Sequence, residues 1–531
     1  MKVGTSYKQQ PAKGNYDAII IGSGMGGLTT AAILAKAGKK ILVLERHYTA
    51  GGFTHTFKRK NYEWDVGIHY IGAVNKPTRT LRRLFDYVSD GKLEWADMGE
   101  VYDRVIFGEK EYRFVKGREN WKRQMKEYFP APDDQRAIDD YVDAVKKANA
   151  SSRTFFVEKA LPPLVSKFSG YFMRASYMKY AERTTLEVMR EITRNQELIG
   201  VLTAQYGDYG LPPSQSSFAI HAMVANHYFD GGYYPVGGAG RIADTIQPVI
   251  ESAGGKIYIN ADVSEIIVKN NKAVGVKMAD GNEIFADMVI SNAGLINTYR
   301  KLIPGEIGKR LGFSELLKKV TPSAAHLSLY IGLKHTAKEL NLPKANYWIY
   351  PDNYDHDANL LNYVNNPDAP LPVAYISFPA AKDPDFENRF PGRSTIEVIG
   401  FTPYEWFKKW EGTQWSHRGE EYEALKEKFS QRLLEQLYRF EPQVKGKVDV
   451  YELSTPLSTA NFVNYGNGEI YGINHTPDRF SLKFLRPSTP VKNLYLTGQD
   501  IATCGVAGAL MSGLLTASAA LKKNVSSEIF K

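Results

Sequence analysis

A glycine-rich segment near the start of the chain has the residue types and spacing of a nucleotide-binding loop. An apolar run leads into Gly22, Gly24 and Gly27, and an alanine-rich run follows. Glycine permits a tight turn and a close approach of the backbone to a pyrophosphate, and the first N–H groups of a following helix favour phosphate. We therefore expect a strand, a phosphate-binding turn and a helix, with Met25 and Gly26 also at the ligand.

An acidic residue lies at the distance that this motif requires. A second apolar run ends at Glu45, eighteen residues after the last glycine of the motif. A carboxylate there accepts hydrogen bonds from a ribose and repels a 2′-phosphate, which disfavours an NADP-type ligand at this site. Arg46, Gly51 and Gly52 follow closely and extend the predicted nucleotide site. This half of the site leaves FAD and NAD as alternatives.

A segment near the end of the chain distinguishes these alternatives. Residues 493–496 form an apolar run that predicts a strand, and a glycine and an aspartate follow at its carboxyl end, where open α/β sheets bind ligands. A helix of small residues comes next, and its positive end would face the pyrimidine edge of a flavin. The expected ligand-side residues are Gly498, Asp500, Gly505, Val506 and Gly508. A nicotinamide site requires neither element, so FAD is favoured. No second glycine motif is evident, and NAD(P)H stays open only as an external reductant.

Proton-donating and aromatic side chains recur in two further segments. One contains His69 and Tyr70, close in sequence to the nucleotide loop. The other contributes the candidate site residues Tyr206, Asp208, His227, Tyr233 and Tyr234. Such groups can transfer a proton, and aromatic rings stabilise a cation. Each has a structural alternative, because buried tyrosine and histidine commonly serve packing.

These segments together resemble the FAD-binding flavoprotein superfamily that includes amine oxidases, phytoene desaturases and carotenoid isomerases. More narrowly, the chain resembles the retinol saturase family. The matching stretches are residues 67–72, 207–210, 226–228, 231–235, 390–395, 404–407 and 494–504. The resemblance covers about residues 17–522, and it implies FAD as cofactor and a backbone contact from Val263 to its adenine side. Vertebrate members carry a hydrophobic N-terminal targeting segment that this sequence does not match.

The resemblance also implies a reaction. It is the reduction of a C=C bond in a conjugated polyene, retinol-like or carotenoid, by hydride from flavin N5 together with a proton. A carotenoid or phytoene desaturase and a cis-trans carotenoid isomerase share the fold and stay open as alternatives. An amine oxidase and a non-catalytic flavin- or lipid-binding protein are more distant. The sequence does not indicate the electron donor.

The composition sets limits on partners and location. The 531 residues carry a net charge of +9, but no dense basic block typical of nucleic-acid binding is present. The single cysteine, Cys504, excludes an intramolecular disulfide and a cysteine-rich metal site, and we expect no metal. Residues 1–18 contain no apolar signal. We therefore expect a cytoplasmic protein, or one bound peripherally to the cytoplasmic face of a membrane.

One segment has the pattern of a membrane-contacting helix. Within residues 161–183, Leu164, Phe168 and Phe172 recur at helical spacing among basic side chains, after a pair of prolines. Such a helix lies in a membrane interface or packs on its own domain as an ordinary amphipathic helix.

The order of these elements predicts an α/β protein. We expect a Rossmann-like FAD-binding domain formed by residues 1–75, 226–295 and 486–531. Residues 76–225 and 296–485 would form a discontinuous substrate domain of mixed sheet and helices. This is the flavin amine-oxidase and phytoene-desaturase architecture.

Overall fold

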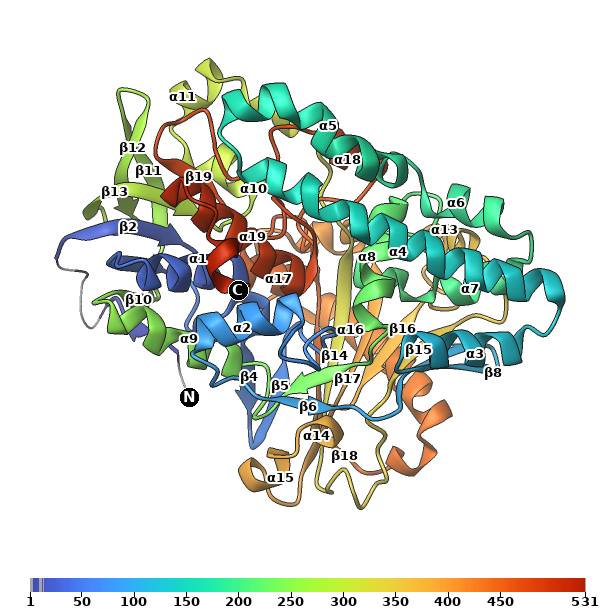
Figure 1. The fold of residues 1–531 in the computed structure, drawn as a ribbon. Helices are drawn as coiled ribbons and strands as arrows, with labels where there is room; N and C mark the ends of the chain where they lie inside the picture. Colours follow the sequence, from blue (N-terminus) through green and yellow to red (C-terminus); the bar gives the residue numbers. More distant parts are fainter. Residues whose placement is uncertain (1–2, 9–11, 13, 531) are drawn as a thin grey trace.

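The computed structural model describes residues 3–8, 12 and 14–530, with two large sheets and a layer of long helices (Figure 1). The first sheet has the strand order β1-β10-β3-β2-β13-β12-β11, and β19 also pairs with β13. The strands of this sheet are β1 Thr5–Ser6, β2 Tyr16–Ile21, β3 Ile41–Leu44, β10 Lys256–Ile259, β11 Val263–Lys269, β12 Lys272–Met278, β13 Glu283–Ser291 and β19 Leu494–Leu496. The pairings from β1 to β13 and that of β19 are parallel.

The predicted strand, turn and helix at the glycine motif are confirmed. β2 leads into helix α1, Met25–Lys36, and β3 returns parallel to β2 with Ile20 opposite Val43. Every α1 residue from Met25 to Ala35 is buried. The small side chains of α1 allow this, because the helix packs between the sheet and two other helices, α9 Arg241–Ser252 and α19 Gly505–Leu521.

The second sheet has the order β18-β14-β17-β16-β15-β7-β8. Its strands are β7 Val101–Phe107, β8 Lys110–Val115, β14 Ala325–Leu333, β15 Asn346–Tyr350, β16 Ala374–Ser377, β17 Ser394–Thr402 and β18 Val448–Ser454. All neighbours are antiparallel except β15 and β7. Two segments more than 200 residues apart therefore complete one sheet. All nine residues of β14 are buried, as expected for a strand covered on both faces.

A helical layer crosses one side of the molecule (Figure 1). It consists of α3 Arg118–Tyr128, α4 Pro132–Ala160, α5 Pro163–Ala181, α6 Thr185–Ile192, α7 Gln196–Leu202, η2 Ala204–Asp208 and α8 Phe218–Tyr228. Helix α4 contacts α5, α8 and also α19, so this layer reaches the first sheet's helices. No helix in the described ranges is long and apolar enough to cross a membrane.

The remaining elements flank or connect these layers. They are η1 Gly52–Thr54, β4 Thr56–Arg59, β5 Tyr62–Asp65, α2 Thr80–Ser89, β6 Trp95–Asp97, β9 Tyr233–Pro235, α10 Leu295–Asn297, η3 Thr298–Leu302, α11 Gly305–Arg310, α12 Phe313–Leu317, α13 His356–Asn365, α14 Pro379–Lys382, α15 Phe386–Arg389, η4 Tyr404–Trp410, α16 Glu420–Phe440, η5 Pro442–Val444, α17 Pro456–Val463, α18 Pro477–Ser481 and α20 Ser526–Ile529. The predicted domain limits stay a prediction. The expectation that residues 1–18 contain no apolar targeting signal concerns, in part, residues 1–2, 9–11 and 13, which lie outside the described part of the chain.

Candidate active site

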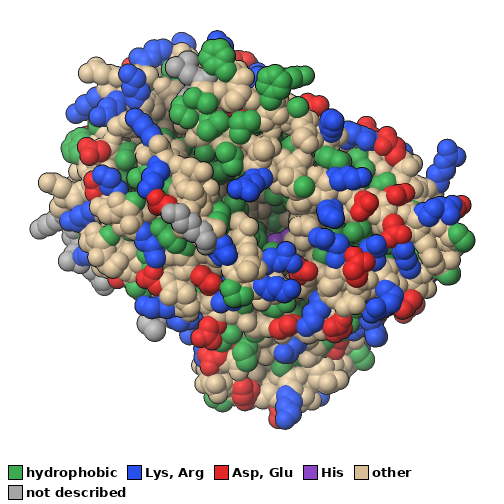
Figure 2. All heavy atoms as spheres, in the orientation of Figure 1, with side chains coloured by type: hydrophobic (Ala, Val, Ile, Leu, Met, Phe, Trp, Pro, Cys, Tyr) green, Lys and Arg blue, Asp and Glu red, His purple; other side chains and the backbone are tan. Residues whose placement is uncertain are grey.

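One large cavity, with a volume of about 1860 Å³, runs between the two sheets and the helical layer. The glycine loop and the start of α19 line it from one side, and strands β14 to β17 of the second sheet line it from the other. Figure 2 shows a hollow near the centre of one face, with histidine at its base and Lys and Arg side chains around its rim. The cavity therefore joins the predicted nucleotide site to the predicted substrate region.

The glycine loop fits a ligand whose phosphates approach the backbone. A Cβ atom on Gly27 would lie 2.2 Å from the carbonyl oxygen of Gly22, and one on Gly26 would lie 2.6 Å from the nitrogen of Gly498. Side chains are therefore excluded where the loop meets the β19 end of the sheet. The N-terminus of α1 has no side-chain cap, and Gly24, Met25 and Gly26 line the cavity. Its N–H groups are thus placed for phosphate.

Glu45 lies beside this loop, as predicted. Its Oε2 accepts hydrogen bonds from the N–H of Ser23 at 2.8 Å and from the Ser23 hydroxyl at 2.7 Å, and its Oε1 accepts one from the N–H of His47 at 2.8 Å. The N–H of Gly51 in turn donates to the Ser23 hydroxyl at 3.0 Å. Because the carboxylate is anchored by three donors, it is presented in one orientation. The cavity is also lined here by Arg46, Gly51, Gly52 and Val263.

The C-terminal motif forms the cavity wall next to the glycine loop. Asp500 Oδ2 accepts a hydrogen bond from the N–H of Leu295 at 2.7 Å, and Oδ1 accepts one from the N–H of Ile473 at 3.0 Å. Asp500 thus ties three chain segments together at the cavity wall. Four further predicted residues, Gly498, Gly505, Val506 and Gly508, line the same wall. All the predicted cofactor residues except Gly27 border the cavity, and Gly27 packs directly behind it.

Tyr70 lies between two carboxyl groups at the substrate side. Its hydroxyl is 3.1 Å from Asp103 Oδ2 and 3.2 Å from Asp208 Oδ2. Its ring stacks on Tyr228, with centroids 4.1 Å apart and planes 8° from parallel. Asp208, Tyr70 and Tyr228 line the cavity, whereas Asp103 lies behind them, fully buried. Burial, reinforced by the charge of Asp103, raises the pKa of Asp208 well above its usual value.

Two predicted histidines also line the cavity. Nδ1 of His69 lies 2.8 Å from Oε2 of Glu397, a carboxyl with no exposed surface. Burial, followed by the charge of Lys382, lowers the pKa of His69 to about 4, and burial raises that of Glu397 to about 8. His227 accepts a hydrogen bond at Nε2 from the N–H of Gly72 at 2.7 Å, and burial lowers its pKa to about 4. Both imidazoles are therefore neutral at neutral pH.

The structure places three predicted residues away from the cavity wall. Tyr206 is fully buried, with its ring centroid 4.8 Å from that of His356. Tyr234 donates a hydrogen bond to Asp65, and the Tyr233 hydroxyl donates to the carbonyl of Asp230 at 3.3 Å. Their contacts are those of packing residues, and a contact of these side chains with a ligand stays a prediction.

Sequence reasoning missed several polar residues behind the cavity. They are Asp103, Lys382, Asn346 and Glu397. Two of them carry a signal in the sequence, because Asp103 and Glu397 are each the one acidic residue of a mostly buried strand. Lys382, in the short helix α14, has no such signal. It donates hydrogen bonds to the carbonyl of His69 at 2.9 Å and to Asn346, which tertiary contact alone brings near.

A dinucleotide-binding parallel sheet, a second sheet and a shared cavity define a two-part nucleotide-dependent enzyme fold. Residues 25–521 match the family of flavin containing amine oxidoreductases, so the chain belongs to that family of flavoproteins. The solved structure of cyclohexylamine oxidase from Brevibacterium oxydans covers 98% of this chain and 100% of its own, with a TM-score of 0.58 at 14% identity. The predicted fold class is confirmed.

Relatives within this family are closer in sequence. The chain is 38% identical to all-trans-retinol 13,14-reductase of Danio rerio, over 97% of this chain and 87% of the relative. A second Danio rerio protein, described as an inactive all-trans-retinol 13,14-reductase, is 35% identical over the same shares of both chains. Prolycopene isomerase of Arabidopsis thaliana is 26% identical over 96% of this chain and 83% of the relative. These relatives confirm the predicted resemblance to the retinol saturase family.

Proposed function

We propose that this protein is an FAD-dependent reductase of a C=C bond in a conjugated polyene, with a retinol-like alcohol as the first candidate substrate. The observation that carries the proposal is the large cavity, which joins the glycine loop to an apolar compartment containing the Asp208–Tyr70 pair. The 38% identity to a retinol 13,14-reductase supports the substrate class. The inactive relative shows why activity must be tested directly.

FAD, rather than a smaller flavin, suits the nucleotide side of the cavity. The α1 N-terminus would hold the pyrophosphate, Glu45 the ribose and Val263 the adenine side, while Gly498 and Asp500 would border the flavin end. When bound and reduced, the flavin supplies a hydride equivalent at N5. The protein must then supply one proton, position the polyene and exclude water.

The hydrogen bonds among Tyr70, Asp103 and Asp208 indicate which of these groups carries the proton that the reaction needs. The Tyr70 hydroxyl has one proton but lies within hydrogen-bond distance of both Asp103 and Asp208. Asp103 also accepts from Gln205 Nε2 at 2.9 Å and from Asn346 Nδ2 at 3.0 Å, as expected of a carboxylate. The Asp208 carboxyl has no partner but Tyr70 in the part of the chain that the structure describes.

It follows that Tyr70 donates to Asp103, and that Asp208 carries its own proton and donates to the oxygen of Tyr70. Burial next to a carboxylate favours the same protonation state, because two adjacent charges in an apolar wall are costly. Asp208 is therefore our candidate acid at the cavity, and Tyr70 orients it. Rings of Tyr228, Trp348 and Tyr375 line the same compartment, where they exclude water and would stabilise positive charge on a protonated polyene.

The decisive experiment uses FAD-loaded protein, chemically reduced without oxygen and mixed with all-trans-retinol or a carotenoid. We expect a product heavier by two hydrogens and stoichiometric flavin oxidation. An isomer of unchanged mass would instead support the isomerase alternative. The similarity to prolycopene isomerase makes this alternative specific. Hydrogen removal by the oxidised protein would identify a desaturase, and peroxide formation with amines an amine oxidase. Binding of the polyene without any reaction would support a non-catalytic lipid-binding protein. Adding NADPH in place of the chemical reductant tests it as the external donor.

We also propose peripheral membrane contact through α5. Phe168, Tyr171 and Phe172 are each 78–79% exposed on this helix, and Figure 2 shows hydrophobic side chains gathered over it. Nearby, Val157 is both exposed and part of the cavity wall, so the cavity reaches the surface close to α5. Exposed Lys167 adds attraction to anionic lipid. A polyene could enter without crossing water, and we place the protein on the cytoplasmic face of such a membrane.

Sedimentation with phosphatidylserine-containing vesicles tests this contact. Phe172→Glu should weaken vesicle binding by at least tenfold, because burying one large apolar side chain contributes about 1.5–3 kcal/mol. The matched control is Leu361→Glu on α13, where the leucine is 63% exposed and far from the cavity wall. Equal binding of wild-type protein and F172E would remove α5 as the contact.

A further inference from the structure

The loop between β19 and α19 is held from behind by two buried basic side chains. Arg479 Nη2 donates hydrogen bonds to the carbonyls of Gln499 at 2.7 Å, Asp500 at 3.1 Å and Ala502 at 3.3 Å. Lys159 Nζ donates to the carbonyl of Ile501 at 3.0 Å. Four consecutive carbonyl groups therefore point to the protein interior, while the loop borders the cavity on its other side.

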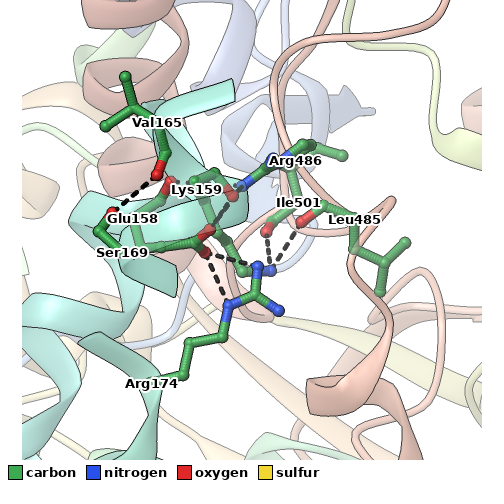
Figure 3. Close-up of polar contacts among 9 residues, drawn as sticks. Glu158, Lys159, Val165, Ser169, Arg174, Leu485, Arg486 and Ile501 are labelled. Atoms are coloured by element: carbon green, nitrogen blue, oxygen red, sulfur yellow. Dashed lines mark hydrogen bonds and ion pairs between the residues drawn. The ribbon is translucent and has the colours of Figure 1, made fainter. Parts of the chain in front are cut away.

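The two basic side chains come from distant parts of the chain. Lys159 lies in the last turn of α4, and its Nζ also donates to the carbonyl of Leu485 at 2.7 Å (Figure 3). Arg479 lies in α18 and donates to the carbonyl of Ile473 at 2.6 Å. They are 6% and 4% exposed, and neither borders the cavity. In the described ranges neither forms an ion pair with a carboxylate, although burial of such cations is costly.

The carboxylates around this cluster do not balance its positive charge. Glu158, fully buried, is bound by Arg174 at 2.6 Å and by Arg486 at 2.9 Å (Figure 3). The nearby charge of the Asp500 carboxylate raises the pKa of Arg479, against the larger lowering caused by burial. Three arginines thus face two carboxylates, which leaves one positive charge in excess even if Lys159 is neutral. Burial lowers the pKa of Arg479 only to about 10, so it remains charged at neutral pH.

We infer that Arg479 and Lys159 form a clamp that holds residues 499–502, and that the charge of Arg479 makes this cavity wall selective for a negatively charged occupant, the anionic reduced state of the flavin. Reduction of the flavin by two electrons and one proton leaves one negative charge on its ring system. Excess positive charge behind a low-dielectric wall stabilises that state relative to the neutral oxidised one. The inference rests on the proposed function only for the identity of the cofactor.

The clamp is tested by redox titration of the FAD-loaded protein against dyes, without any polyene. In wild-type protein the midpoint potential should be more positive than that of free FAD. Arg479→Gln should lower the preference for reduced over oxidised flavin about tenfold, which is about 30 mV for a two-electron couple. Burial lowers the pKa of Lys159 well below its usual value, so Lys159→Met removes a hydrogen bond to the loop rather than a full charge and should give a smaller shift in the same direction. Arg479→Lys keeps the charge and should recover most of the shift. The matched control is Lys147→Met, an exposed cation on the same helix.

Each outcome is decisive. A wild-type potential at or below that of free FAD overturns the inference even if both variants fail to fold. An unchanged potential in folded, flavin-loaded R479Q overturns it as well. A shift in R479Q that is absent from K147M supports it. Because no polyene is present, failure of the proposed reductase reaction would leave these results intact, whereas failure to bind FAD at all would refute the cofactor assignment itself.

Discussion

Asp103 offers the sharpest test of how the candidate acid is controlled. It does not border the cavity, yet its carboxylate accepts hydrogen bonds from Tyr70, Gln205 and Asn346. Asp103→Asn keeps the shape of the side chain and removes its charge. If Asp103 acts by keeping the proton on Asp208, the variant should retain the reaction at low pH and lose it at a lower pH than the wild-type protein does.

The size of the effect follows from the geometry. Both carboxyl oxygens lie within about 3 Å of the Tyr70 hydroxyl, so they are no more than about 6 Å apart. At an effective dielectric constant of about 20, two unit charges at that separation interact by about 2.8 kcal/mol. One pKa unit corresponds to about 1.4 kcal/mol. Removing the Asp103 charge should therefore displace the alkaline limb of the rate profile downward by about two pH units.

The assay is the rate at which polyene oxidises the reduced flavin, measured by anaerobic stopped flow from pH 5 to pH 10. Wild-type activity should fall as pH rises through the pKa of Asp208, because the acid form is the active one. Asp97→Asn, at a surface carboxylate paired with Lys116, is the matched control. An alkaline limb at the same pH in folded D103N and in wild-type protein would refute the electrostatic role of Asp103.

Three further outcomes are expected. Gly27→Ala should abolish flavin binding in a spectroscopic titration, because its Cβ would lie 2.2 Å from a carbonyl oxygen, whereas Gly305→Ala, in open space, should bind normally. Burial raises the pKa of Glu397 to about 8, so the folded state holds a proton that the unfolded state releases near pH 4.5. The unfolding free energy should fall from pH 5 to pH 8, and less so in E397Q; equal slopes in thermal denaturation would contradict this. Arg174→Met should lower the free energy of unfolding in denaturant by about 3 kcal/mol, because it leaves the buried Glu158 carboxylate with fewer partners. Arg136→Met, which breaks an exposed ion pair, should lower it by only about 0–1 kcal/mol. Equal losses would count against a structural role for the buried pair.

The nucleotide side of the molecule could be predicted because its constraints are local. Gly22 to Gly27 and Glu45 lie within one strand-helix-strand unit, so their spacing in the sequence is their spacing in space. The exposed face of α5 follows the same rule, because Phe168 and Phe172 are one helical turn apart. Asp500 was found through its position after an apolar strand.

The substrate side could be predicted only in part. His69, Tyr70, Asp208 and His227 do border the cavity, but Tyr206 packs in the aromatic core, and nothing in its local sequence distinguishes it from the others. A tyrosine at a site and a tyrosine in a core have the same flanking residues. What differs is which face of the element meets empty space, and that depends on how the second sheet packs against the helical layer.

The sequence by itself determined the nucleotide-binding unit, the family and the cofactor class, because backbone conformation and residue spacing impose them within short segments. Only the tertiary structure decided which groups we propose to control the proton and the charge in the cavity. Asp103 meets Asp208 through Tyr70, and Arg479 meets Lys159 behind residues 499–502, across separations of more than 100 and more than 300 residues. Protonation depends on distance and burial, and neither exists until the chain has folded.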